Sequence, residues 1–306
     1  MNSRRDFIKY GTAALIGSAC LCSGQLTAQS MGSSKYLNLP LGLQLYSVRD
    51  VLPTDYDGTL KQIGSLGYRE VEGAGFYNHS ASDVKRALQQ AGLRCVSAHY
   101  SHEQIQTQFD QIVAFSKEVG MQYIICPSPT YKDPSSHKSG YGKPEPTFTL
   151  EDWRWNAEQF NQIGKKFHAV GLKFGFHNHA RPFIKQDGIV PYDELMRLTD
   201  PAYVTMEMDC GWVVVGGGNP VDLLRRYPTR ISMLHVKDFK LNGTPAVGEH
   251  LTSTALGQGS IDYRPIFEAA ARTGHVKHCF VEQEQYNMPI MQELKVNAEY
   301  MRKFHA

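Results

Sequence analysis

Short apolar segments rich in β-branched and aromatic residues alternate with amphipathic helical patterns along almost the whole chain. This alternation predicts a parallel sheet whose strands are joined by crossover helices. Glycine follows several of the helical segments, as in Ala91-Gly92 and Val170-Gly171, which is typical of helix C-termini. The expected strands are Leu41–Val48, Arg69–Gly73, Leu93–His99, Tyr123–Pro127, Leu172–His177, Tyr203–Asp209, Ile231–Val236 and Cys279–Glu284.

Strand-helix units repeated eight times within 306 residues predict an α/β fold, a (β/α)8 TIM barrel. A doubly wound open sheet is the alternative, but no Gly-x-Gly-x-x-Gly motif follows the first strand. The expected helices are Thr59–Leu66, Ser82–Ala91, Glu103–Val119, Glu151–Val170, Tyr192–Leu198, Pro220–Tyr227, Tyr263–Thr273 and Ile290–Phe304.

The N-terminus has the pattern of a cleavable export signal. Arg4-Arg5 is followed by an apolar stretch, Tyr10–Ala19, that is too short to span a membrane. We therefore expect a twin-arginine signal peptide at 1–28, a linker at 29–38 and a single barrel catalytic domain at 39–306. This route carries folded proteins, so the export machinery is an expected partner, and the mature protein is expected in the periplasm without membrane attachment.

The composition limits the kinds of molecule that this chain can be expected to bind. A formal net charge of +2 offers no basic surface for nucleic acid, which favours a small-molecule ligand. Beyond the signal, the cysteines occur singly in expected strands, which predicts buried free thiols. These cysteines are Cys95, Cys126, Cys210 and Cys279. The sequence also allows a homo-oligomer.

Polar side chains gather where the later strands end. Because side chains alternate along a strand, His177 and His179 share a face, and so do Glu207 and Asp209. Barrel enzymes keep their active sites at this end. His, Asp and Glu ligands suit a divalent metal that keeps positions open for substrate. The strand-end residues are His177, His179, Glu207, Asp209, His235, Lys237 and Glu282.

The ends of the earlier strands complete the expected mouth of the barrel. Gln44, Glu72 and His99 end strands one to three and are expected to offer hydrogen bonds to a substrate. Trp212 follows the sixth strand, where it could stack on a substrate ring. These side chains are therefore predicted to bind substrate.

Two connections at the same end are unusually long. Residues 131–150 follow the fourth strand, and residues 238–260 follow the seventh. Loops of this length in a compact domain are often functional, and we expect them to act as lids.

Several segments, in chain order, resemble the xylose-isomerase-like sugar phosphate isomerase/epimerase family. The resemblance covers essentially the whole mature chain. Its His-x-Lys-Asp and Gly-x-Gly-x-x-Asp elements are specific for the family but not for the substrate. The segments are Gly42-Leu43-Gln44-Leu45-Tyr46-Ser47, Gly67-Tyr68-Arg69-Glu70-Val71-Glu72, His177-Asn178-His179, Asp209-Cys210-Gly211-Trp212, Leu234-His235-Val236-Lys237-Asp238, Leu256-Gly257-Gln258-Gly259-Ser260-Ile261-Asp262 and Val281-Glu282-Gln283-Glu284.

The resemblance implies one divalent metal ion per chain, with Mn, Mg, Co and Zn all open. Three of the family's ligands match Asp209, His235 and Glu282. Many relatives have Glu at the end of strand five, where this chain has His177, with His179 two residues later. The fourth ligand is therefore one of these two histidines, and His177 is the favoured one.

The resemblance also implies a mechanism. Epimerase members exchange a proton between two glutamates on opposite faces of an enediolate. Here Glu282 remains as the base. The acid would be Glu207 or a histidine such as His179, and Lys237 would neutralise the enediolate. The function implied is a metal-dependent isomerase or epimerase that enolises an unphosphorylated sugar, since phosphorylated sugars are cytoplasmic.

Other functions stay open at this stage. A base paired with one acid also serves a lyase that cleaves a 3-keto-glycoside by β-elimination. A non-catalytic sugar-binding protein and an endonuclease IV-like nuclease are further alternatives. The net charge argues against the nuclease.

The export prediction can be tested by changing Arg4 and Arg5 together to Lys. We expect uncleaved precursor to accumulate in the cytoplasm, because the export receptor recognises the guanidinium pair. Immunoblots of cytoplasmic and periplasmic fractions, with the wild type in parallel, provide the measurement. An unchanged yield of mature periplasmic protein would exclude the twin-arginine route.

Overall fold

The computed structural model describes residues 36–133, 135, 148–247 and 251–304. The predicted signal peptide, most of the predicted linker and the middle of the first long loop lie outside these residues. Within the compact unit Ser34–Ala306, parallel strands close into a barrel in the order β1-β10-β7-β6-β5-β4-β3-β2, which confirms the (β/α)8 fold. The barrel strands are β1 Gly42–Gln44, β2 Glu70–Gly73, β3 Arg94–His99, β4 Tyr123–Cys126, β5 Lys173–His177, β6 Val204–Asp209, β7 Ile231–Val236 and β10 His278–Val281.

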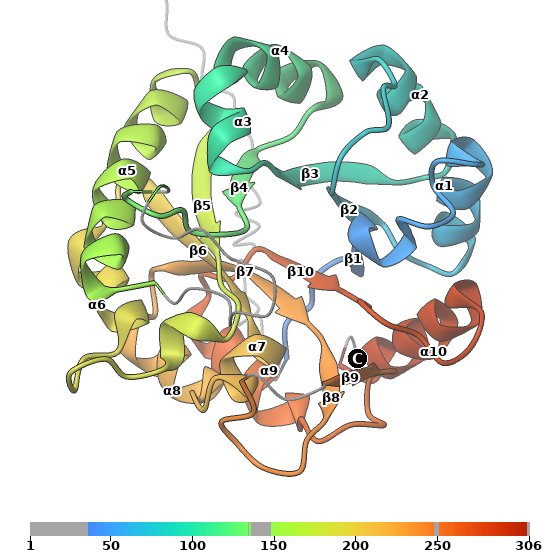
Figure 1. Cartoon of the computed structure of the whole chain (residues 1–306). Helices are drawn as coiled ribbons and strands as arrows, with labels where there is room; N and C mark the ends of the chain where they lie inside the picture. The colour runs from blue at the N-terminus through green and yellow to red at the C-terminus, as the bar shows by residue number, and fades with distance from the viewer. Residues whose placement is uncertain (1–35, 134, 136–147, 248–250, 305–306) are drawn as a thin grey trace, which may run out of the picture. The chain divides into compact units, whose positions relative to one another are not determined.

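Helices surround the strands, as Figure 1 shows. Side chains cap several of them: Ser80 accepts a hydrogen bond from the amide of Asp83, and Thr149 forms a capping box with Asp152. No described helix combines the length and apolar character that a membrane span requires. The helices are α1 Tyr56–Ser65, α2 Ala81–Gln90, α3 His102–Thr107, α4 Phe109–Val119, α5 Leu150–Ala169, α6 Pro191–Leu198, α7 Cys210–Val215, α8 Pro220–Arg226, α9 Tyr263–Thr273 and α10 Ile290–Arg302.

Two strands are shorter than predicted. The side chain of Gln44 accepts a hydrogen bond from the amide of Tyr46, and this starts a 3-10 helix, Leu45–Val48, where strand was expected. After β10, the amide of Gln283 donates a hydrogen bond to the hydroxyl of Ser47 and not to a neighbouring strand. The residues that follow β1 and β10 are therefore irregular and can shape the mouth of the barrel.

Two helical predictions also need correction. The expected helix Glu103–Val119 is two helices, because Gln108 leaves helical geometry with φ −127° and ψ 24°. The short helix α7 was missed, although Asp209 is a good N-cap residue and its side chain caps this helix. The cysteine prediction is confirmed, since the cysteines of the described chain are free and buried.

The second long connection, which was expected to form a lid, contains two short strands, β8 (Asp238–Lys240) and β9 (Thr252–Thr254). These strands pair with each other in antiparallel fashion. Asp238 organises the chain that follows: its carboxylate accepts hydrogen bonds from the amides of Gly257, Gly259 and Ile261. A Cβ at Gly259 would overlap this carboxylate. The close approach of Asp238 therefore explains Gly259, whereas Gly257 has a φ of +80° and a Cβ there would overlap the ring of Tyr300.

Replacing Asp238 with Ala should destabilise the barrel by about 2 to 4 kcal/mol, because several amides lose their acceptor. Urea unfolding followed by circular dichroism gives the measurement. Asp222→Ala is the control, since that exposed carboxylate lies 3.8 Å from Arg225 and should contribute little. Equal unfolding midpoints for the two variants would contradict the proposed role of Asp238.

Candidate active site

The register of adjacent strands brings the predicted ligands together. Asp209 on β6 lies opposite His235 on β7, and β5 and β10 lie on the outer sides of this pair. His177, Asp209, His235 and Glu282 each offer a donor atom, and these atoms lie within 4.8 Å of one another. All four side chains are buried. The carboxyl end of the barrel therefore contains a compact cluster of two imidazoles and two carboxylates.

The donor set of this cluster fits a divalent ion. Nδ1 of His177 lies 3.0 Å from a carboxylate oxygen of Glu207, which leaves Nε2 as the nitrogen for ligation. Oδ2 of Asp209 is buried and has no hydrogen bond among the described residues, although the Nζ of Lys237 lies 3.1 Å away. Mixed nitrogen and oxygen ligands are typical of zinc and related metals. His179 is in neither of the metal-compatible groups of the described chain, which supports His177 as the fourth ligand.

Asp209 is held in place through its own backbone and side chain. Its Oδ1 accepts a hydrogen bond of 2.8 Å from the amide of Trp212. The buried side chain of Asn178 bonds both the amide and the carbonyl of Asp209. Burial raises the pKa of Asp209 to about 6 although the nearby Lys237 lowers it. The middle residue of His-Asn-His thus positions a neighbouring ligand.

Lys237 lies completely buried among carboxylates. Its Nζ lies 2.8 Å from Glu282, 2.5 Å from Glu284 and 3.1 Å from Asp209. The hydroxyl of Tyr263 bonds both the amide and the carbonyl of Lys237 and so holds its backbone. The ammonium group is therefore in place to neutralise the site carboxylates.

A second layer lies beneath the cluster. Nε2 of His235 lies 2.8 Å from Glu72, while its Nδ1 lies 3.0 Å from Glu282. Glu72 also accepts a hydrogen bond from Gln44 at 2.7 Å and lies 2.9 Å from His99. Burial raises the pKa of Glu72, but the two histidines outweigh it and hold the value well below the ordinary range. This layer orients the imidazole of His235.

Glu207 belongs to the same layer. One of its oxygens lies 2.9 Å from His99, 3.0 Å from His177 and 3.3 Å from His235. Its side chain is fully buried. Burial and the nearby Glu72 raise its pKa, but His235 and His177 outweigh them and lower it to about 2. The position of Glu207 favours orienting histidines over transferring a proton to substrate.

A cavity of about 520 Å³ opens above the cluster. Of the residues predicted to bind substrate, His99 and Trp212 line it, whereas Gln44 and Glu72 lie fully buried outside it. No lysine or arginine is among the described residues that line it. The principal polar lining residues are His99, His177, His179, Glu282, Glu284, Tyr46, Ser101 and Gln104.

Several lining residues received no role in the sequence predictions, Glu284 and Tyr46 among them. Glu284 contacts Lys237 and accepts a hydrogen bond of 3.2 Å from the indole of Trp212. Glu284 lies two residues after Glu282, and in a strand this spacing would put both side chains on the same face. The chain is irregular there, so the spacing alone did not predict its position. Tyr46 is 44% exposed at the rim, and its place in a 3-10 helix could not be read from an apolar pattern.

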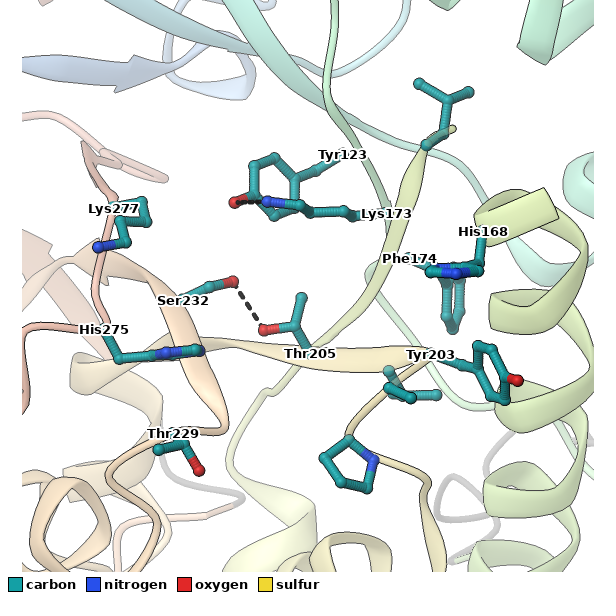
Figure 2. Close-up of a pocket in the computed structure, with 14 residues that line it drawn as sticks. Tyr123, His168, Lys173, Phe174, Tyr203, Thr205, Thr229, Ser232, His275 and Lys277 are labelled. Atoms are coloured by element: carbon teal, nitrogen blue, oxygen red, sulfur yellow. Dashed lines mark hydrogen bonds between the residues drawn. The ribbon is translucent and has the colours of Figure 1, made fainter. Parts of the chain in front are cut away.

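A different cavity, of about 300 Å³, lies at the opposite, amino end of the strands. Figure 2 shows Tyr123 bonded to Lys173 and Thr205 bonded to Ser232 in this pocket. It contains none of the residues predicted for catalysis, substrate binding or metal binding. The candidate active site is therefore the cavity at the carboxyl end.

The comparisons with known proteins agree with this fold. A family model described as xylose isomerase-like TIM barrel matches residues 60–304. The chain belongs to this family.

Among its relatives, an inosose dehydratase of Clostridium tetani (strain Massachusetts / E88) is 25% identical over 247 residues, which are 75% of this chain and 82% of that protein. The structure of a sugar phosphate isomerase/epimerase from Parabacteroides distasonis ATCC 8503 has a TM-score of 0.68 and 25% identity, over 87% of this chain and 98% of that chain. The IOLI protein with a bound zinc atom is 14% identical with a TM-score of 0.68 over the same shares, a likeness of fold alone.

The cluster predicts that metal content depends on the named ligands. Asp209→Asn and His235→Ala should each lose at least about 90% of bound metal, because ligand loss typically lowers affinity severely. Plasma mass spectrometry on purified protein gives the metal content, and circular dichroism checks the fold. Asp193→Asn, a carboxylate paired with Arg226 on a distant helix, is the control. A wild type without stoichiometric metal would refute the site.

Proposed function

We propose that this protein is a metal-dependent carbon–oxygen lyase acting on an unphosphorylated keto sugar or its glycoside. It removes a proton α to a carbonyl and expels the oxygen substituent on the β carbon. This reverses the order of preference drawn from sequence alone, in which the isomerase or epimerase came first. The observation that carries the proposal is the uneven distribution of carboxylates around the cavity.

Only Glu282 and Glu284 are acidic among the described residues that line the cavity. Glu284 is held by Lys237 and Trp212 at the rim. The strand-five position is His177, and Glu207 lies beneath it. Epimerisation needs a proton-transfer group on each face of the substrate, whereas elimination needs one base and one donor to the leaving oxygen. One available carboxylate favours elimination.

Glu282 is ionised in the site, although its lowered pKa makes it a weak proton acceptor. Burial raises its pKa, but Lys237 and His235 dominate and hold the value well below the ordinary range. Among the described residues, its hydrogen bonds and ion pairs all involve Oε2. Oε1 is therefore the oxygen left to approach the substrate.

His179 is the proposed donor to the departing oxygen. It lines the cavity, and its ring centroid lies 5.0 Å from that of His177 and 5.7 Å from that of Trp212. Burial, and then Lys237, lower its pKa to about 4. A neutral imidazole retains one N–H donor. His179 can thus hydrogen-bond the leaving oxygen.

A divalent ion at the four ligands would act as a Lewis acid and stabilise the negative charge that develops on the carbonyl oxygen. The bound zinc of the IOLI protein supports a metal of this kind. We assign Glu72, Glu207 and Lys237 to positioning these ligands and balancing their charge.

Two observations support an unphosphorylated substrate. The lining contains no lysine or arginine among its described residues, so a phosphate would meet carboxylates without a cationic partner. As part of the same proposal, the N-terminal signal pattern supports a periplasmic location for the mature protein. Elimination is further supported by the relative named inosose dehydratase, since a dehydratase eliminates water. The isomerase/epimerase name of the Parabacteroides relative keeps an isomerase as the second candidate.

The two candidates differ in their products. Incubation of a 3-keto-glucoside in deuterated water, followed by proton NMR, should show release of the alcohol and an unsaturated ketone. An isomerase would conserve mass and retain the alcohol. Glu282→Gln should slow release by about a thousandfold, because loss of a general base typically costs 10² to 10⁴.

The metal content of Glu282→Gln must be measured in parallel, because the same residue is a proposed ligand. Glu284→Gln is the matched carboxylate control, and its turnover should stay within about tenfold of the wild type. Rapid turnover by Glu282→Gln would show that another residue is the base.

A further inference from the structure

A second cavity adjoins the active site. It measures about 500 Å³ and shares two lining residues, His179 and Trp212, with the first cavity. Its other walls come from the segment after β4, the start of α5, the turn after β5 and the ends of the β8–β9 connection. The two cavities are therefore neighbouring compartments separated by His179 and Trp212.

The compartments differ in chemistry. The first carries histidines and carboxylates, whereas no Asp or Glu is among the described residues that line the second. Aromatic rings form its wall in a continuous series: Tyr131 stacks on Phe148 with centroids 4.1 Å apart, Phe148 lies 5.4 Å from Trp153, and Trp153 lies 6.5 Å from Phe176. Such a wall suits a planar apolar group.

Polar side chains also line this compartment, among them Arg181 and Ser128, and the lining residue Trp153 carries an unpaired polar atom. The indole Nε1 of Trp153 is buried and has no hydrogen-bond partner among the described residues. A buried N–H group is normally bonded, and a ligand oxygen that reached Nε1 of this lining residue would satisfy it. The occupant is therefore expected to combine an aromatic ring with an oxygen acceptor.

We propose that the second compartment binds the aromatic aglycone of a glycoside whose keto-sugar ring lies in the first. This inference rests on the proposed elimination, and it names the substrate class as 3-keto-glycosides of aromatic alcohols. Because His179 lies between the compartments, the glycosidic C–O bond of a molecule that spans both lies beside it.

The reaction balances within this substrate. The C–H bond at C2, α to the C3 ketone, breaks, and its proton goes to Glu282. A C1–C2 double bond forms as the C1–O bond breaks, and the electron pair leaves with the oxygen. That oxygen, hydrogen-bonded by His179, takes a proton from solvent to give the free alcohol, and Glu282 returns its proton to solvent. The ketone is retained, so no oxidant is consumed. An earlier oxidation of the sugar's C3 hydroxyl must supply the substrate.

The test compares ethyl and 2-phenylethyl 3-keto-glucosides. Their leaving alcohols have similar acidity, so the ratio of kcat/KM values reports the binding of the ring. We expect the wild type to prefer the phenylethyl substrate by at least about tenfold, since burying an aromatic ring on this scale is favourable.

The variants address the compartment directly. Val247→Trp fills it from a position that is 37% exposed, and Phe148→Ala removes part of its wall. The preference should fall below about threefold in each variant. Ile184→Ala changes an exposed apolar residue outside the lining and should keep the wild-type ratio. Thermal unfolding of each variant checks that the barrel is intact.

The outcomes separate the two proposals. If the wild type cleaves both substrates at equal kcat/KM, or if the variants keep its preference, the aglycone compartment is refuted while the lyase stands. If neither substrate is cleaved, the lyase is refuted. In that case calorimetric binding of unoxidised ethyl and 2-phenylethyl glucosides still tests the compartment, and equal affinities would overturn it.

Discussion

Compensation of buried charge holds the carboxyl end of this barrel together. Glu72, Glu207, Asp209 and Glu282 are all buried there, and an unpaired carboxylate in such a position would be strongly destabilising. Each of them contacts an imidazole or the ammonium of Lys237, and the partners come from different strands. The contacts that neutralise the charges therefore also fix the mutual positions of the strand ends. Stability and site geometry have the same origin.

The two layers of the site have different roles. The upper layer presents ligands and a base to the cavity. The lower layer, built around Glu72 and Glu207, contacts the far sides of the same imidazoles. Carboxylates bonded to a ligating histidine fix its orientation and raise its basicity. A change in the lower layer should therefore alter the ligands above it even though it does not touch substrate.

The barrel and most of the cluster could be predicted because both follow from periodicity. Strand and helix patterns identify the fold, and alternation along strands places Asp209 and His235 at one level. Irregular chain gave no such signal: the 3-10 turn with Tyr46 and the rim position of Glu284 depend on hydrogen bonds to distant residues. The sequence also contained no sign of which strand-end side chains would be buried. Glu72 stands at the end of its strand like a cavity residue, but it lies beneath the histidines.

The same charge compensation bears on the choice of substrate. Lys237 is surrounded by Asp209, Glu282 and Glu284, so its charge is already balanced and cannot serve an incoming phosphate. Histidine at position 177 removes a carboxylate from the cavity and recruits Glu207 as its buried partner. The groups that remain toward the substrate are one carboxylate base, neutral donors and an adjoining cavity with a largely aromatic wall. This combination favours a neutral substrate from which one proton and one oxygen substituent depart.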